Sequence, residues 1–292
     1  MAALDLRPLS LGELLDRTFF LYRRHFLLFV GIAAIPYSFF FVVNLGSALL
    51  PVFVRAAAGS TRPVGLTSVA VGGGIFALIA FLVGGIAFLF SVGATVYAVS
   101  ELYMGRQISI RDALGRVRGH SVTIFGVLFL SFIIMVAGFI ALIIPGIYLM
   151  CRICVATPAA LLEDMGATES IRRSFSLTKS FAGRAFMIYL LYFALVWGVV
   201  AMFQFPFMVL MGINAKQMHL FVLWTVLAQV GNFLGSVLVA PVSTIGFALF
   251  YYDLRVRKEA FDLQMMMRAV GVDPTPAPIT GGVPSMFGRD AS

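Results

Sequence analysis

Six long apolar stretches, nearly free of acids and lysines, divide this chain. They run over residues 26–54, 69–99, 122–144, 146–162, 185–213 and 220–252. Most exceed the roughly 20 helical residues needed to cross a hydrocarbon core about 30 Å thick, and only the fourth, with 17, is marginal. The chain is 61% hydrophobic and 12% charged, far from the roughly 25% charged residues of soluble domains. The sequence therefore predicts an all-α, polytopic membrane helix bundle with six transmembrane helices.

The positions of lysine and arginine predict the orientation, because these residues resist translocation. Six spans with the N-terminus inside place 17 of the 21 Lys and Arg on the inner side, leaving Arg55, Arg62 and Lys216 outside and Arg152 within a span. A rival interpretation treats Pro145-Gly146 as a kink and fuses the third and fourth stretches into one crossing. We favour six spans, because Pro-Gly is a strong turn signal and 41 residues are too many for one crossing. Both termini are then cytosolic.

A short segment ahead of the first apolar stretch recurs later in the chain. Residues 13–23 resemble 169–179 at seven of eleven positions, and 112–116 form a weaker copy. Each copy directly precedes an apolar stretch. The pattern predicts three pseudo-repeats, about 9–100, 108–163 and 167–252, each a lead-in helix followed by a transmembrane hairpin.

The three lead-in segments have the apolar periodicity of amphipathic helices. The apolar or weakly polar positions are Leu11, Leu14, Leu15, Thr18, Phe19 and Tyr22, then Ile110, Ala113, Leu114 and Val117, then Ala167, Ile171, Ser174, Phe175 and Thr178. Ser109 with Asp112 resembles a capping box at the second helix start. Basic helices beside spans are expected to lie in the interface with their apolar faces toward acyl chains. The alternative is packing against the other cytosolic helices.

The segments before the first apolar stretch and after the last one predict different structures. No secretory signal precedes Phe26, because Asp5, Glu13 and Asp16 interrupt that segment. Residues 253–261 are expected to extend the last span as a charged helix. The membrane domain thus covers 1–270, and the proline- and glycine-rich residues 271–292 are expected to form a disordered cytosolic tail.

Several segments, in the same order along the chain, resemble one bacterial family. They are residues 6–12 (Leu-Arg-Pro-Leu-Ser-Leu-Gly) with 13–17, Pro145-Gly146-Ile147-Tyr148, 163–177 and 251–259. The chain resembles the glycerophosphoryl diester phosphodiesterase membrane-domain family over nearly its whole length except the tail. The resemblance implies a helical polytopic protein of a bacterial cytoplasmic (inner) membrane. The soluble phosphodiesterase domain of some members is not in this sequence, so that activity does not carry over.

The charge placed within an apolar stretch, Arg152, is the first functional candidate, since intramembrane charge is costly. Asn44, Gln229 and Asn232 are further polar residues within spans, expected to join helices or to line a solute path. Glu101, Glu163 and Asp253 stand at cytosolic span ends and are expected to pair with the arginines of the repeats. Cys151 and Cys154 lack the additional ligands that zinc needs, so we predict no metal and no cofactor.

The sequence contains none of the hydrolase, protease or nucleotide-binding motifs considered, so we predict no catalytic residues and no enzyme. The net charge of +8 lies mainly on one face, which favours anionic lipid headgroups over nucleic acid as partners. We expect a lipid-interacting scaffold or accessory subunit, with Arg17, Arg116, Arg173 and Lys179 contacting headgroups, and with a protein partner or a second copy as further possibilities. The alternative is a channel or carrier with Arg152 in its path, which would require a polar cavity that reaches Arg152.

Overall fold

The computed structural model describes residues 9–58, 66–214 and 217–259, and every regular element in these ranges is a helix. The helices are α1 (Leu11–Arg24), α2 (Phe26–Ala58), α3 (Leu66–Tyr103), α4 (Ile110–Gly119), α5 (Ser121–Ala141), α6 (Ile143–Ile153), α7 (Ala156–Leu162), α8 (Ala167–Thr178), α9 (Ala182–Ile213) and α10 (Met218–Glu259). The predicted tail at 271–292 lies outside the described residues.

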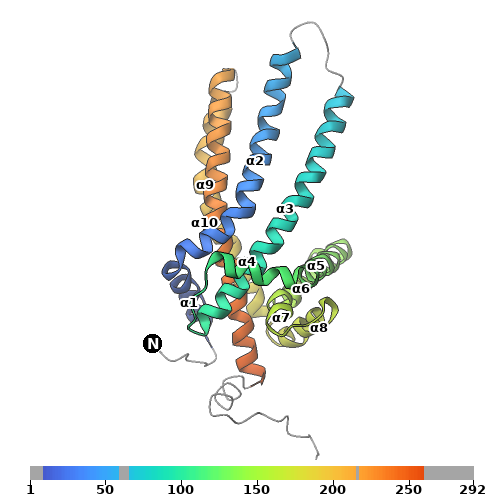
Figure 1. The fold of residues 1–292 in the computed structure, drawn as a ribbon, viewed down its shortest axis with the longest axis vertical. Helices are drawn as coiled ribbons and strands as arrows, with labels where there is room; N and C mark the ends of the chain where they lie inside the picture. Colours follow the sequence, from blue (N-terminus) through green and yellow to red (C-terminus); the bar gives the residue numbers. More distant parts are fainter. Residues whose placement is uncertain (1–8, 59–65, 215–216, 260–292) are drawn as a thin grey trace, which may run out of the picture.

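Six helical segments of the described chain are long and apolar enough to cross a membrane, as predicted. They are Phe26–Leu49, Leu82–Tyr103, Ser121–Ala141, Ile143–Leu162, Ala182–Ile213 and His219–Glu259. The long helices α2, α3, α9 and α10 form the upper part of the molecule in Figure 1, while α1, α4, α7 and α8 gather around their lower ends. The predicted charged extension of the last span is also present, since α10 continues to Glu259.

Glycines allow the long helices to approach closely where a side chain would not fit. A Cβ atom at Gly231 would lie 2.4 Å from the Phe203 carbonyl oxygen, and one at Gly246 would lie 1.7 Å from the Tyr192 hydroxyl. Both contacts join α10 to α9. Gly231 and Gly235 of α10 therefore pack closely against α9, which follows the small-residue rule for membrane helices.

The third and fourth apolar stretches form a hairpin of α5 and α6, which pack against each other. The chain reverses at Leu142, whose backbone is extended (φ −178°, ψ 161°), three residues before the predicted Pro145-Gly146 turn. Pro145 instead lies in the first turn of α6, where its missing N–H is no loss. In Figure 1 the hairpin lies beside the lower half of the long helices. The fused single crossing is thus excluded.

Each lead-in helix meets its long apolar helix at a corner of similar backbone geometry. The corner residues are His25 (φ −120°, ψ 37°), His120 (φ −115°, ψ 11°) and Phe181 (φ −123°, ψ 15°). In each case the amide four residues later donates to the corner carbonyl, and the residues at that position, Phe29, Ile124 and Ala185, are fully buried. The same turn therefore begins three of the apolar helices. The repetition itself stays a prediction.

The apolar faces of the lead-in helices pack into the protein. The residues seven and three positions before each corner are buried, namely Thr18 and Tyr22, Ala113 and Val117, and Ser174 and Thr178. These helices contact α10, α3 and α7, respectively, among others. The expectation that these faces point toward acyl chains is therefore wrong, because the other helices of the charged end already cover them.

Candidate functional site at the charged end

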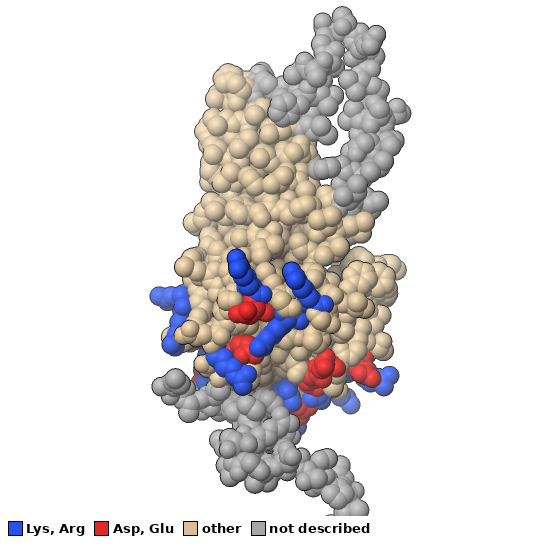
Figure 2. All heavy atoms as spheres, viewed as in Figure 1, with Lys and Arg blue, Asp and Glu red and all other residues tan. Residues whose placement is uncertain are grey.

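Figure 2 shows Lys, Arg, Asp and Glu gathered at the lower end of the described surface, below a broad band with none. This charged end is built from α1, α4, α7, α8 and the lower ends of the long helices. Charges stay hydrated only outside the hydrocarbon core, so this end marks a membrane boundary. Three groups of polar contacts organise it.

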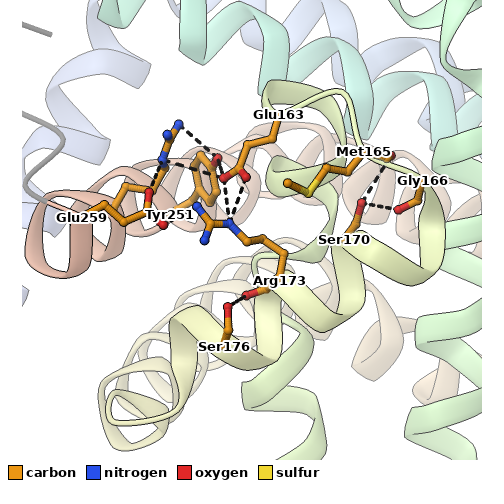
Figure 3. A network of polar contacts seen from close by, with 9 residues as sticks. Glu163, Met165, Gly166, Ser170, Arg173, Ser176, Tyr251 and Glu259 are labelled. Atoms are coloured by element: carbon orange, nitrogen blue, oxygen red, sulfur yellow. Dashed lines mark hydrogen bonds and ion pairs between the residues drawn. The ribbon is translucent and has the colours of Figure 1, made fainter. Parts of the chain in front are cut away.

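The first group centres on Glu163, which follows α7. The Glu163 carboxylate accepts hydrogen bonds from Arg173 Nε, with Oε2 at 2.9 Å, and from the Tyr251 hydroxyl. Arg173 also pairs with Glu259, and Arg255 Nε lies 3.1 Å from Glu259 Oε2. In Figure 3 these side chains converge between α8 and α10.

Local sequence explains why these groups meet. Tyr251, Arg255 and Glu259 are spaced by four residues and so share one face of α10. After Glu163 the chain reverses through Asp164, whose φ of 53° is uncommon for a residue other than glycine. This turn starts α8 and brings Arg173 back beside Glu163.

The second group centres on Asp253, whose side chain is fully buried. It accepts from the Leu9 amide at 2.7 Å and from Arg257 Nε, and Arg184 Nη2 lies 3.5 Å away. Arg184 and Arg257 also donate to the Leu9 carbonyl at 2.7 and 2.6 Å. Three segments remote in sequence, the residues just before α1, the start of α9 and the end of α10, are thus fastened at one carboxylate.

The third group joins α3 to α4. Glu101, whose side chain is 9% exposed, pairs with Arg116, and Arg106 lies 3.7 Å away. Close by, the Tyr97 hydroxyl is 3.1 Å from His120 Nδ1, and His120 Nε2 is 2.9 Å from Asp164. The prediction that Glu101, Glu163 and Asp253 pair with arginines is confirmed, although Asp253 uses Arg184 and Arg257 rather than an arginine of a lead-in helix.

The surroundings also set the charge of two groups outside the spans. Burial lowers the pKa of the Arg173 guanidinium, but the carboxylates of Glu163 and Glu259 more than offset this, and its net pKa is raised. Burial, with a smaller effect from Arg24, lowers the pKa of His25. Arg173 thus remains charged, whereas the corner at His25 is neutral at pH 7.

The four predicted headgroup contacts lie in different settings. Arg173 is engaged with Glu163 and Glu259, and Arg116 with Glu101, so neither is available to lipid without breaking a pair. Arg17 is half-buried on α1, and Lys179 is exposed just after α8. The sequence could not distinguish the paired arginines from the exposed cation, because the same helical periodicity is compatible with an arginine in an ion pair and with one in solvent.

The predicted intramembrane residues do not form one site. Arg152 packs at the charged end, where its carbonyl accepts from Ser174 (2.7 Å) and Thr178 (3.1 Å) of α8. Asn44 is exposed on α2 and donates to the Phe40 carbonyl of its own helix at 2.7 Å. Gln229 and Asn232 are half-buried on α10. Arg152 therefore lies nearer to the residues of the charged end than its place in the apolar stretch implied.

A cavity of about 180 Å³ lies between α2, α3, α9 and α10. Hydroxyl groups of Ser91, Thr95, Ser236, Ser243 and Thr244 line it, together with Tyr37 and apolar side chains. Arg152 is not among the lining residues. The carrier hypothesis requires a polar cavity that reaches Arg152, and this cavity does not reach it.

Within the described residues no three His, Cys, Asp or Glu side chains come together as a metal site. Cys151 is buried and Cys154 half-buried in the apolar interior. Sequence reasoning missed two contributors to the charged end, Tyr251 and Lys258. The four-residue spacing of Tyr251 with Arg255 could have pointed to the first.

The chain matches no protein-family model, no curated protein and no solved structure. The resemblance to the membrane-domain family therefore stays a prediction, and the functional argument depends on the charged end alone.

Proposed function

We propose that this membrane protein is a non-enzymatic lipid-interacting scaffold or accessory subunit of a bacterial inner membrane, with its charged end in the cytosol. The observation that carries the proposal is the division of charge at that end. The acids Glu101, Glu163 and Asp253 have side chains exposed by 11% or less, and each is less exposed than its arginine partner. The outer surface is left mainly to cations.

Exposed basic residues form a rim around the lead-in helices. They are Arg23 and Arg24 on α1, Arg111 and Arg118 on α4, and Arg172 on α8. Each cation near an anionic bilayer surface contributes about 1 kcal/mol of attraction. Because the apolar faces of these helices are packed inside, lipid contact depends on this rim rather than on insertion of an amphipathic face.

The non-enzymatic part of the proposal is supported by the pairing of the acids. Glu101, Glu163 and Asp253 accept hydrogen bonds from arginine, which fixes the position of each carboxylate. A general acid or base needs access to a substrate, whereas these three side chains are exposed by 11% or less. These three carboxylates are suited to holding helices together.

The test measures lipid preference at the protein surface. Quenching of Trp197 and Trp224 by brominated lipids gives the relative binding constant of phosphatidylglycerol against phosphatidylcholine in reconstituted protein. Replacing Arg24, Arg111, Arg118 and Arg172 together by Gln should abolish most of the preference for phosphatidylglycerol, while replacing the same four by Lys should retain it. An unchanged preference in the Gln variant would refute the proposal.

A carrier is the second candidate, and the hydroxyl-lined cavity is the observation that favours it. It predicts solute flux in proteoliposomes. Flux that is lost on Thr244→Val would place the path through the cavity, whereas flux lost only on Arg152→Ala would place it through α6. Absence of flux for small ions, sugars and amino acids would leave the scaffold as the supported function.

A further inference from the structure

Arg152 is a nearly buried cation that forms no ion pair with an acid of the described residues. The residue is 9% exposed, and among the described residues its Nε is a buried nitrogen that has no hydrogen-bond acceptor. Its guanidinium carbon instead lies 5.2 Å from the Phe175 ring centroid and 5.7 Å from that of Tyr148. Contacts of this kind are weaker than the hydration that a cation loses on burial. An anion beside Arg152 would offset that loss.

Two lysines face the same region. Lys258, at the end of α10, donates from Nζ to the Ser176 carbonyl of α8, and Lys179 follows directly after α8. The charges of Arg152, Lys179 and Arg173 all act on Lys258. The ends of α6, α8 and α10 thus bring their cations together.

The neighbouring acids offset this group only in part. Glu163 and Glu259 both pair with Arg173 and Arg255, and Glu259 also acts on Lys258. In the described part of the chain, these five cations outnumber the two acids, so net positive charge remains around Arg152, Lys179 and Lys258. An arginine fork with flanking ammonium groups is the donor set that proteins use for phosphate.

The surface leading to Arg152 is suited to a lipid. Ile144 and Tyr148 precede Arg152 at intervals of four residues, so all three lie along one stripe of α6. Ile144 is 80% exposed and Tyr148 51% exposed. The stripe runs from the apolar hairpin tip to the charged end, the direction in which an acyl chain leads to its headgroup.

We propose that Arg152, Lys179 and Lys258 bind the phosphate group of one anionic phospholipid, with its acyl chains along α6. This inference depends on the proposed lipid interaction and assigns it a specific site. It is distinct from the rim, which attracts anionic lipid collectively.

The test counts lipids retained by the full chain, purified in mild detergent, by native mass spectrometry during titration with phosphatidylglycerol. The wild type should retain one tightly bound phosphatidylglycerol. Arg152→Gln should weaken that binding about tenfold. Arg106→Gln, which replaces an exposed cation after α3 that is not part of the rim, should leave it unchanged. If Arg152→Gln does not fold, Lys179→Gln/Lys258→Gln serves instead, because both lysines are exposed. Binding that is unchanged in these variants would overturn the site.

Competition with inorganic phosphate distinguishes a lipid headgroup from a free phosphate ion as the ligand of this site. If phosphate alone displaces the retained lipid at micromolar concentration, the site recognises a free anion and the lipid assignment is overturned. Displacement only at concentrations that screen charge generally supports it. Loss of the tight lipid in Arg152→Gln, together with loss of the phosphatidylglycerol preference in the four-Gln rim variant, would support both proposals. Loss of that preference in the rim variant, with no tightly bound lipid on the wild type, would end only this inference.

Discussion

Helices α1 and α8 occupy matching places 156 residues apart, yet they attach to the protein by different chemistry. Both end at the same kind of corner, and the residues at matching positions are buried in each, Leu14, Thr18 and Tyr22 against Ser170, Ser174 and Thr178. At these positions α1 buries two large side chains and one threonine, whereas α8 buries three small side chains that carry hydroxyl groups, beside its apolar Ile171 and Leu177. The comparison shows that matching places in the fold bury matching positions of the two helices. The contacts that the buried side chains make depend on the residue type at each position.

The difference has a direct consequence for Arg152. Ser174 and Thr178 donate to its carbonyl and hold the end of α6 against α8. On α1 the matching Thr18 donates to the Leu14 carbonyl of its own helix, and the Tyr192 hydroxyl lies 3.4 Å away. α8 is thus adapted to hold a charged neighbour, and α1 is adapted to pack.

The largest effect should come from the acid that anchors α8. Glu163→Gln removes the charge facing Arg173, and loss of one partner of a buried pair costs about 3–5 kcal/mol. Titration with SDS in mixed micelles measures the free energy of unfolding. The neighbouring Asp164→Asn is the control, because its pair with His120 is on the surface and such pairs contribute about 0–1 kcal/mol. Equal losses in the two variants would contradict the assigned role of Glu163.

The next effect tests the contrast between the two helices at one matched position. Leu14→Ala should destabilise by about 2–5 kcal/mol, since it leaves a cavity in a fully buried site. Ser170→Ala removes a hydroxyl that bonds only to nearby carbonyls of the preceding turn, so a loss of about 1 kcal/mol is expected. The same SDS titration applies. If Ser170→Ala lowered the free energy of unfolding as much as Leu14→Ala does, the proposed difference between the packing of α1 and that of α8 would be wrong.

A smaller effect is expected where α8 holds α6. The double variant Ser174→Ala/Thr178→Ala leaves the Arg152 carbonyl without these donors, at a cost of about 1–3 kcal/mol. It should also weaken the tightly retained lipid, because the guanidinium loses its fixed position. Thr18→Val, on α1, should leave lipid retention at the wild-type value in the mass spectrum, and a loss there would show that the effect is general.

The smallest effect concerns the helix starts. Ser10 accepts from the Glu13 amide and Glu13 accepts from the Ser10 amide, a full capping box, while Gly166 gives α8 no side-chain cap. Ser10→Ala should cost about 1 kcal/mol, and Gly166→Ser should add a few tenths of a kcal/mol. Destabilisation of α8 by Gly166→Ser in the same titration would show that its start depends on glycine for another reason.

Local patterns in the sequence were sufficient for most of the fold. The apolar stretches predicted the long helices, and Ser109 caps α4 as expected, accepting from the Asp112 amide. The helical periodicity identified the apolar faces of α1 and α4, although these faces pack against protein and not against acyl chains as expected. The hairpin turn was placed three residues late, because Pro145 is equally compatible with a turn and with the first turn of a helix. Neighbouring helices, which decide between these two, are not visible in local sequence.

The sequence by itself determined that this chain is helical, divides into charged and apolar parts, and presents acids at span ends to arginines. Only the tertiary structure decided which arginines are paired, that Asp253 fastens Leu9, and that Arg152 joins Lys179 and Lys258 at the ends of three helices. The reason is physical: hydropathy and periodicity depend on neighbours along the chain, whereas the partner of a charge depends on which helices meet.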